Sequence, residues 1–394
     1  MRLRCDSDRI GGVVVMHEGA LGVPGIPGSG PMAGLRAAYL AGRPADVLQA
    51  AEAVIVTSTD PAEVVEAVTV RAEALAQIGL MADAFSLLQS TRGKETAAGR
   101  PGAAAKLSMA ESALRMASGD AQAATSALVQ AANGFAAAGE TANQIRAQLQ
   151  LAAVYAMTAQ QGRVRDLLGR CLTAARQLGD PEVLAEVRHQ EGLFLTAAGG
   201  NPAPSFEDGL QAADRSANQV VQVQLRVDLG GTLARWDPGR SAGLISAAEA
   251  IASAVSDPLA CANALATVAQ GWWALGRAAD GVRCSDQALA QLRAVGARVM
   301  LIRLAAVTAD VCSAAGRPDD ARRYLGEAMT VGEQIGGPGG AANVMVIVGQ
   351  AALQRGDQVR ALQAFRDAAA RLQAARLPVP PQLAAAIGNP GSSA

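Results

Sequence analysis

The residue types that most often carry catalysis are few in this chain and do not converge. It holds two histidines, His17 and His189, and five scattered cysteines without a CxxC pair. Catalysis needs several polar groups with matched pKa values at one place. The sequence contains no GxSxG, HExxH or GxxxxGK[ST] motif that would supply such a set. We therefore expect no catalytic residue, no metal site and no cofactor, and we predict that the chain is not an enzyme.

The reactive residues that are present have simpler interpretations. Cys171, Cys261, Cys284 and Cys312 fall in expected helices, where a free thiol packs as a small apolar side chain. An odd, scattered set of cysteines favours neither a disulfide framework nor a zinc site. The one enzymatic alternative is a general base at His189, which has Glu186 and Glu191 nearby in the sequence. A lone histidine on a helix is more often a surface or groove residue.

Composition favours closely packed helices and argues against several partners. Half of the residues are hydrophobic and only 3% are aromatic, with alanine dominant, and alanine is the strongest helix former. The 34 basic and 35 acidic residues give a net charge of -1 without a basic block, so we expect no direct nucleic-acid or membrane partner. No membrane span or secretion signal is visible, which predicts a cytoplasmic protein. The excess of arginine over two lysines is typical of GC-rich bacterial genomes.

A small residue recurs about every 40 residues along nearly the whole chain, with alanine-type positions at fixed offsets after it. These markers are Gly42, Gly79, Gly119, Ala159, Gly199, Asp237, Gly276, Gly316 and Gly356. Such a period is typical of stacked supersecondary units rather than of one globular core. The final unit predicts a helix over 341–354, a turn at Gly356 and Asp357, and a second helix over 358–374. The pattern therefore predicts paired helices throughout.

The final unit resembles the tetratricopeptide repeat (TPR) family. Gly349 matches the family's helix-contact glycine, Gly356 its turn glycine, and Ala361, Phe365 and Ala368 its second-helix positions. The resemblance implies an all-α, right-handed α-solenoid of about nine helix pairs, in a variant with repeats of about 40 residues. It also implies that the first helix of each pair lines a concave surface. HEAT or armadillo repeats have a compatible period but lack this glycine-to-alanine offset.

Three segments follow from this organisation. Residues 1–31 form a flexible tail rich in glycine and proline, residues 32–381 form the repeat array, and residues 382–394 form a capping segment and a disordered C-terminus. The start site is Met1, Met16 or Met32, because the helical pattern begins at Met32.

A partner-binding groove is predicted on the first helices of the array, centred on repeats five to eight. Trp272 fits a core position, which turns its neighbour Trp273 towards the groove as an anchor or leaves it packed on a neighbouring repeat. The groove candidates are Arg146, Gln150, His189, Gln190, Gln224, Asp228, Arg235, Asn263, Gln270, Trp273, Arg303, Asp310, Asn343 and Gln350. This amide-rich set suits the backbone of a bound peptide or a helix.

The sequence thus predicts a non-catalytic interaction scaffold or adaptor that binds a protein or peptide. The alternative is a regulatory sensor, for example of transcription, whose superhelix changes shape on binding a peptide or small ligand.

Overall fold

The computed structural model describes residues 31–388, and within that range the chain contains only helices and their connections. The first nine helices are α1 (Pro31–Leu40), α2 (Pro44–Thr57), α3 (Pro61–Gln77), α4 (Met81–Ala97), α5 (Pro101–Ala117), α6 (Ala121–Ala137), α7 (Thr141–Met157), α8 (Gln161–Leu178) and α9 (Pro181–Ala197). The others are α10 (Ala203–Ala213), α11 (Gln219–Leu233), α12 (Pro238–Ala254), α13 (Pro258–Ala274), α14 (Ala278–Val295), α15 (Arg298–Ala314), α16 (Pro318–Gln354), α17 (Gln358–Ala374) and α18 (Pro381–Gly388). The predicted all-α fold of helix pairs is confirmed.

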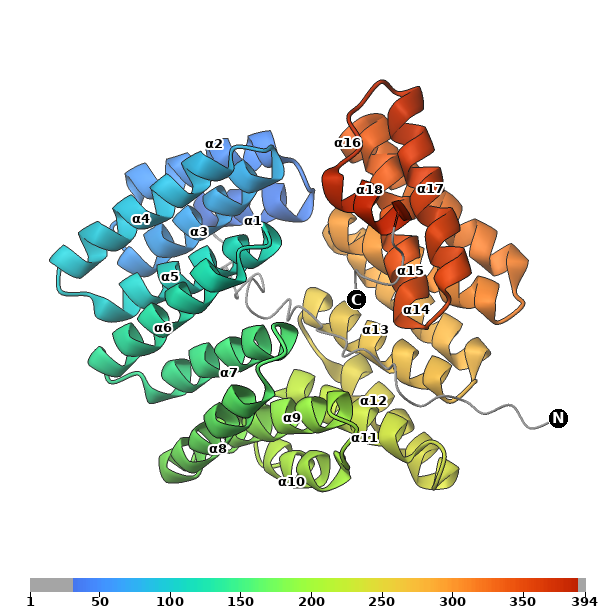
Figure 1. The fold of residues 1–394 in the computed structure, drawn as a ribbon, viewed down its shortest axis with the longest axis horizontal. Coiled ribbons are helices and arrows are strands. Elements are labelled where there is room, and N and C mark those ends of the chain that lie inside the picture. Colours follow the sequence, from blue (N-terminus) through green and yellow to red (C-terminus); the bar gives the residue numbers. More distant parts are fainter. Residues whose placement is uncertain (1–30, 389–394) are drawn as a thin grey trace. The chain divides into compact units, whose positions relative to one another are not determined.

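The chain divides into two compact units. Among the described residues, the N-terminal unit comprises 31–194 and 211–216, and the C-terminal unit comprises 195–210 and 217–388. In the N-terminal unit, α3 contacts both its partner α4 and the next first helix, α5. In the C-terminal unit, α11 contacts α12 and α13 in the same way. Within each unit, the first helices of successive pairs therefore form one layer and the second helices form another (Figure 1).

Helices of 17 residues joined by three-residue turns repeat every 20 residues along the chain, which is half of the predicted period. The turns are made by residues with positive φ, the left-handed conformation that ends many helices. Those at the regular spacing are Gly79, Gly99, Gly119, Gly139, Ala159, Gly179 and Gly199, then Gly276, Gly296, Gly316 and Gly356. Seven of the nine predicted markers belong to this series, and an eighth, Gly42, also has a positive φ. Asp237 is the exception, because its side chain instead caps α12 by accepting from the Arg240 backbone N–H at 2.9 Å.

Ala159 adopts the left-handed conformation without being a glycine. Its φ is 56°, and the Gln160 N–H donates to the Tyr155 carbonyl at 2.9 Å, which closes the turn as at the glycine positions. A Cβ in this region costs about 1 kcal/mol. Replacing Ala159 by glycine is therefore expected to raise the free energy of unfolding by about 0.5 to 1 kcal/mol in urea denaturation. Ala156→Gly, inside α7, is the matched control and is expected to lower it by about 1 kcal/mol; equal signs for the two variants would refute this explanation.

The long helix α16 consists of two helices that belong to successive pairs. Gly336 (φ -127°, ψ 16°) and Gly337 (φ 55°, ψ -142°) are not helical, and Pro338 follows them. α16 contacts α15 before it and α17 after it, and Ala342 and Ala352 of its second part pack in one apolar cluster with Phe365 of α17. The 20-residue repeat of helix and turn therefore continues through α16.

The final pair shows the close packing that the repeat resemblance predicts. A Cβ added at Gly349 would lie 2.4 Å from the Phe365 ring, so only a glycine lets the ring approach this closely. Leu383 and Ala386 of α18 join the apolar cluster around Phe365. Residues 1–30 of the expected tail, which include Met1 and Met16, and residues 389–394 of the expected C-terminal segment lie outside the described residues, whereas Pro31 begins α1.

Candidate functional site

The sixth residue of every first helix is polar. The first helices are α1, α3, α5, α7, α9, α11, α13, α15 and the part of α16 that begins at Pro338. Their sixth residues are Arg36, Glu66, Lys106, Arg146, Glu186, Gln224, Asn263, Arg303 and Asn343, and all are half-buried or exposed. We call this set the sixth-position column. Half of the chain is hydrophobic, yet none of these nine residues is, so this face of the first helices serves polar contacts rather than packing.

In the N-terminal unit, ion pairs join the column residue of α7 to residues of α9. The Arg146 guanidinium binds Glu186 through Nε at 2.9 Å and Glu182 through Nη2 at 2.9 Å. Hydrogen bonding to Glu186 raises the pKa of Arg146. Burial raises the pKa of Glu186, although the Arg146 guanidinium opposes that shift. These contacts hold the first helices of two successive pairs together.

Two steps earlier, from α3 to α5, the column residues are charged but do not form an ion pair. Glu66 lies near enough to Lys106 for the ammonium to lower its pKa, but burial has the larger effect and the pKa of Glu66 is raised. One carboxylate oxygen of Glu66 is buried without a hydrogen-bond donor among the described residues. Lys106 is exposed. Equivalent positions of the column therefore form an ion pair in one place, whereas in another they carry opposite charges that do not form an ion pair.

In the C-terminal unit, the column consists mainly of amides. Asn263 and Asn343 have a second amide seven residues later on the same helix, Gln270 and Gln350. Seven residues are two helical turns, so each pair lies on one helix face. Among residues 31–388, no side-chain hydrogen bond holds these four amides, and Gln270, Asn343 and Gln350 are exposed. We call the four residues the amide rails, since each helix offers two amides with donors and acceptors available.

Most of the predicted groove residues are accessible, but two are not. Arg146, Gln150, Gln190, Gln224, Asp228 and Asn263 are half-buried, and Arg235, Gln270, Arg303, Asn343 and Gln350 are exposed. Asp310 is only 1% exposed, because α15 turns it inward to an ion pair with Arg355 at 2.5 Å. His189 is also buried, on α9. The prediction that Asp310 and His189 face a groove is therefore wrong.

Trp273 packs inside its own helix pair instead of standing free as an anchor. A Cβ at Gly281 would lie 2.1 Å from the Trp273 indole nitrogen, so the ring lies against α14 at that glycine. The indole N–H is buried without an acceptor among the described residues. Trp272 is 2% exposed, which confirms its predicted core position, and its N–H donates to Glu249 at 2.9 Å. We therefore remove Trp273 from the candidate contacts.

Four members of the column were not predicted: Arg36, Glu66, Lys106 and Glu186. The 20-residue spacing of the turn glycines could have found them. It fixes the first residue of each helix, after which counting to the sixth residue gives the column.

The remaining reactive groups do not form a site in the described part of the chain. The four described cysteines are buried, and burial raises the pKa of Cys171 and Cys312 to about 11, which keeps these two thiols protonated at neutral pH. Within residues 31–388, no three His, Cys, Asp or Glu side chains gather closely enough to hold a metal ion. No helix in that range has the length and apolar character needed to cross a membrane.

The stacked helix pairs, their left-handed turns and the polar column define an all-α helical repeat protein. A family model for the tetratricopeptide repeat matches residues 303–374, which run from α15 through α16 to the end of α17. The chain therefore carries tetratricopeptide repeats over this stretch, and the resemblance found in the sequence is confirmed. A comparison with curated protein sequences finds no match.

Several solved structures are similar to the chain. A Signal Transduction ATPase with Numerous Domains (STAND) protein with a tetratricopeptide repeat sensor, from Pyrococcus horikoshii, is 12% identical, with 86% of this chain and 52% of that chain covered and a TM-score of 0.46. The chain thus spans about half the length of that protein. The apo form of the quorum sensor NprR from B. thuringiensis is 14% identical, with coverages of 76% and 87% and a TM-score of 0.47. A Rap protein complexed with Competence and Sporulation Factor is 10% identical, with coverages of 87% and 89% and a TM-score of 0.44.

Proposed function

We propose that the chain is a non-catalytic interaction scaffold whose C-terminal unit binds an extended peptide segment of a partner protein. The observation that carries the proposal is the set of amide rails at Asn263, Gln270, Asn343 and Gln350. Their amides have no side-chain hydrogen bond within the described residues, so nothing in that part of the chain uses their donors and acceptors.

The chemistry of the rails suits a peptide backbone better than a charged ligand. A carboxamide donates two hydrogen bonds and accepts two, so one side chain can bind both the N–H and the C=O of a peptide unit. Thr267 and Ile347 lie between the two amides of their helices and are half-buried, which leaves methyl groups for the peptide's side chains. The rails would then bind the backbone while the methyl groups between them set a mild preference for aliphatic side chains.

A peptide selected by display tests this proposal. Dodecapeptides from a random phage library would be selected on the full chain, and the affinity of a synthetic copy measured by calorimetry. Asn263→Ala together with Asn343→Ala is expected to weaken binding about 10- to 100-fold, because each lost hydrogen bond contributes about 0.5 to 1.5 kcal/mol.

The control variant carries Gln287→Ala and Gln373→Ala, which remove exposed amides from the second helices α14 and α17. It is expected to leave the affinity unchanged. Equal losses in both double variants, or selection of no peptide at all, would overturn the proposed function.

A further inference from the structure

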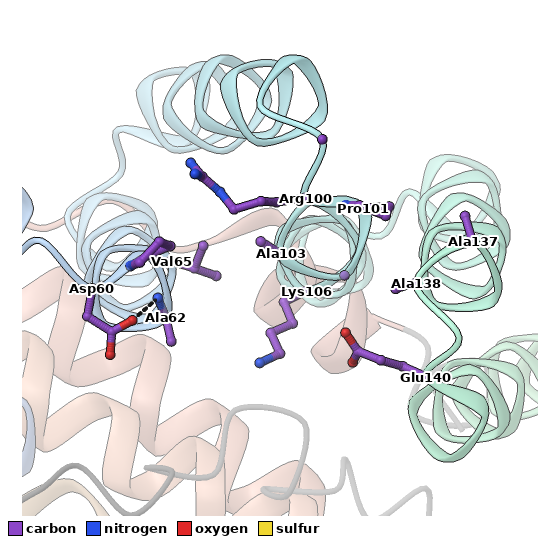
Figure 2. A pocket seen from close by; sticks show the side chains of 13 residues that line it. Asp60, Ala62, Val65, Arg100, Pro101, Ala103, Lys106, Ala137, Ala138 and Glu140 are labelled. Atoms are coloured by element: carbon purple, nitrogen blue, oxygen red, sulfur yellow. Dashed lines mark hydrogen bonds between the residues drawn. The ribbon is translucent and has the colours of Figure 1, made fainter.

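The N-terminal unit contains a pocket of about 620 Å³ formed by two successive helix pairs and the turn before α7. Its walls come from the beginnings of α3 and α5, the end of α6 and the turn before α7 (Figure 2). Pro61, Val65, Pro101, Ala103 and Ala137 give it an apolar lining. Its volume falls within the range of about 300 to 1,000 Å³ that is usual for small-ligand sites.

One cation in this pocket has no ion pair. Lys106, a member of the sixth-position column, lines the pocket, and no carboxylate of the described residues lies within ion-pair distance of its ammonium. Arg100 also lines the pocket, but its guanidinium is held by Glu95, with Nη2 2.9 Å from Oε1. Lys106 is therefore the cation that remains available to a ligand. The equivalent residue of the next repeat, Arg146, instead forms an ion pair with Glu186.

Two carboxylates line the same pocket and are held in place by local hydrogen bonds. Asp60 accepts from the Ala62 backbone N–H at 2.8 Å, and Glu140 accepts from Asn143 at 2.7 Å. The other oxygen of Glu140 lies over Gly102, where a Cβ would be only 2.1 Å away. Figure 2 shows Lys106 and Glu140 pointing into the same space, with Asp60 on the side of α3. The pocket thus presents one positive group between two fixed negative groups.

We propose that this pocket binds a small zwitterion of the α-amino acid class. Its carboxylate would face the Lys106 ammonium, its ammonium would face Asp60 or Glu140, and its side chain would lie on the apolar lining. Asp60 and Glu140 repel a simple anion and Lys106 repels a simple cation, whereas a ligand with both charges is attracted at both ends. The site lies within the N-terminal unit, so this proposal does not depend on the peptide-binding proposal for the C-terminal unit.

The two lysines of the chain make this proposal directly testable. Reductive ¹³C-methylation labels only Lys94, Lys106 and the chain's amino terminus and keeps the positive charge of lysine. A Lys94→Arg variant assigns the signals, and Lys94 is the internal control because it does not line the pocket. The probes are L-leucine, N-acetyl-leucine, which keeps the carboxylate, and leucine amide, which keeps the ammonium.

L-Leucine is expected to shift the Lys106 signal saturably and leave the Lys94 signal in place, and each single-charge probe is expected to bind at least tenfold more weakly. Glu140→Gln should weaken L-leucine binding several-fold, whereas Asp83→Asn, an exposed change on α4, should not. Equal binding of N-acetyl-leucine and L-leucine would replace the zwitterion site by a simple carboxylate site and so overturn the proposal. The same holds if no probe gives a saturable Lys106 shift.

Discussion

Replacing Arg355 by methionine is expected to lower the free energy of unfolding by about 3 to 5 kcal/mol. The Arg355 guanidinium binds Asp310 through Nε at 2.9 Å and Nη2 at 2.5 Å, and the Asp310 side chain is fully buried. Arg360 approaches the same carboxylate only to 3.7 Å. Removing Arg355 therefore leaves a buried carboxylate without its main partner, which is the costly way to break an ion pair.

This loss is expected to depend on pH. Burial raises the pKa of Asp310 even with Arg355 present, and removal of the guanidinium raises that pKa further. A folded-state pKa above the unfolded one destabilises the chain as pH rises, because the folded form must then give up a tightly held proton. The variant should therefore lose less stability at pH 4 than at pH 8.

Urea denaturation at both pH values measures the effect, with Arg322→Met as the matched control. Arg322 also pairs with an aspartate, Asp319, but both side chains are largely exposed, and such pairs contribute at most about 1 kcal/mol. Similar losses in the two variants would show that the burial of Asp310 does not set the energy of its ion pair.

Glu73→Gln is expected to stabilise the chain by about 2 to 3 kcal/mol at pH 8. Glu73 is 9% exposed on α3, and the Tyr39 hydroxyl donates to it at 3.2 Å. Burial raises its pKa from the ordinary value of 4.5 to about 7. Each pKa unit corresponds to about 1.4 kcal/mol between protonation states, so an ionised Glu73 costs about 3 kcal/mol that a neutral amide avoids. Glutamine also keeps an acceptor for Tyr39.

The sign of this effect fixes its pH window. Because the folded-state pKa is the higher one, stability falls as pH rises from about 4.5 to about 7 and then levels off. The advantage of Glu73→Gln over the unchanged chain should therefore grow across that window and nearly vanish at pH 4. Thermal unfolding at a series of pH values measures this advantage. Asp83→Asn is the control, and its stability difference from the unchanged chain is expected to stay constant across the series. A constant advantage for Glu73→Gln across the whole pH range would exclude titration as its cause.

The sequence predicted the helix pairs well because their ends are marked by residues with a local physical cause. Gly356 and Asp357 predicted the turn of the final pair, and α17 begins at the predicted residue, 358. The close approach of Gly349 and Phe365 was predictable for the same reason, since a glycine facing an aromatic ring marks a helix contact. Even the unusual turn at Ala159 was located, because its neighbours keep the spacing.

The direction of individual side chains was predicted less well. Trp273 and Asp310 were both assigned to a solvent-facing groove, yet the Trp273 ring lies against Gly281 of α14 and the Asp310 side chain is buried against Arg355. Adjacent helical residues point about 100° apart, so an error of one residue in a helix start moves a side chain from one face to another. The partners that draw these side chains inward, Gly281 and Arg355, lie 8 and 45 residues further along the chain. Periodicity alone does not reveal such pairings.

We infer that the amide rails of the C-terminal unit bind the backbone of an extended peptide. The most direct test titrates one display-selected peptide and its backbone N-methylated copies into the full chain and into the Asn263→Ala/Asn343→Ala variant. We predict that N-methylation at one or two positions weakens binding to the full chain at least tenfold and has little further effect on the variant. Equal effects of N-methylation on both proteins would show that the amide rails do not bind the peptide backbone.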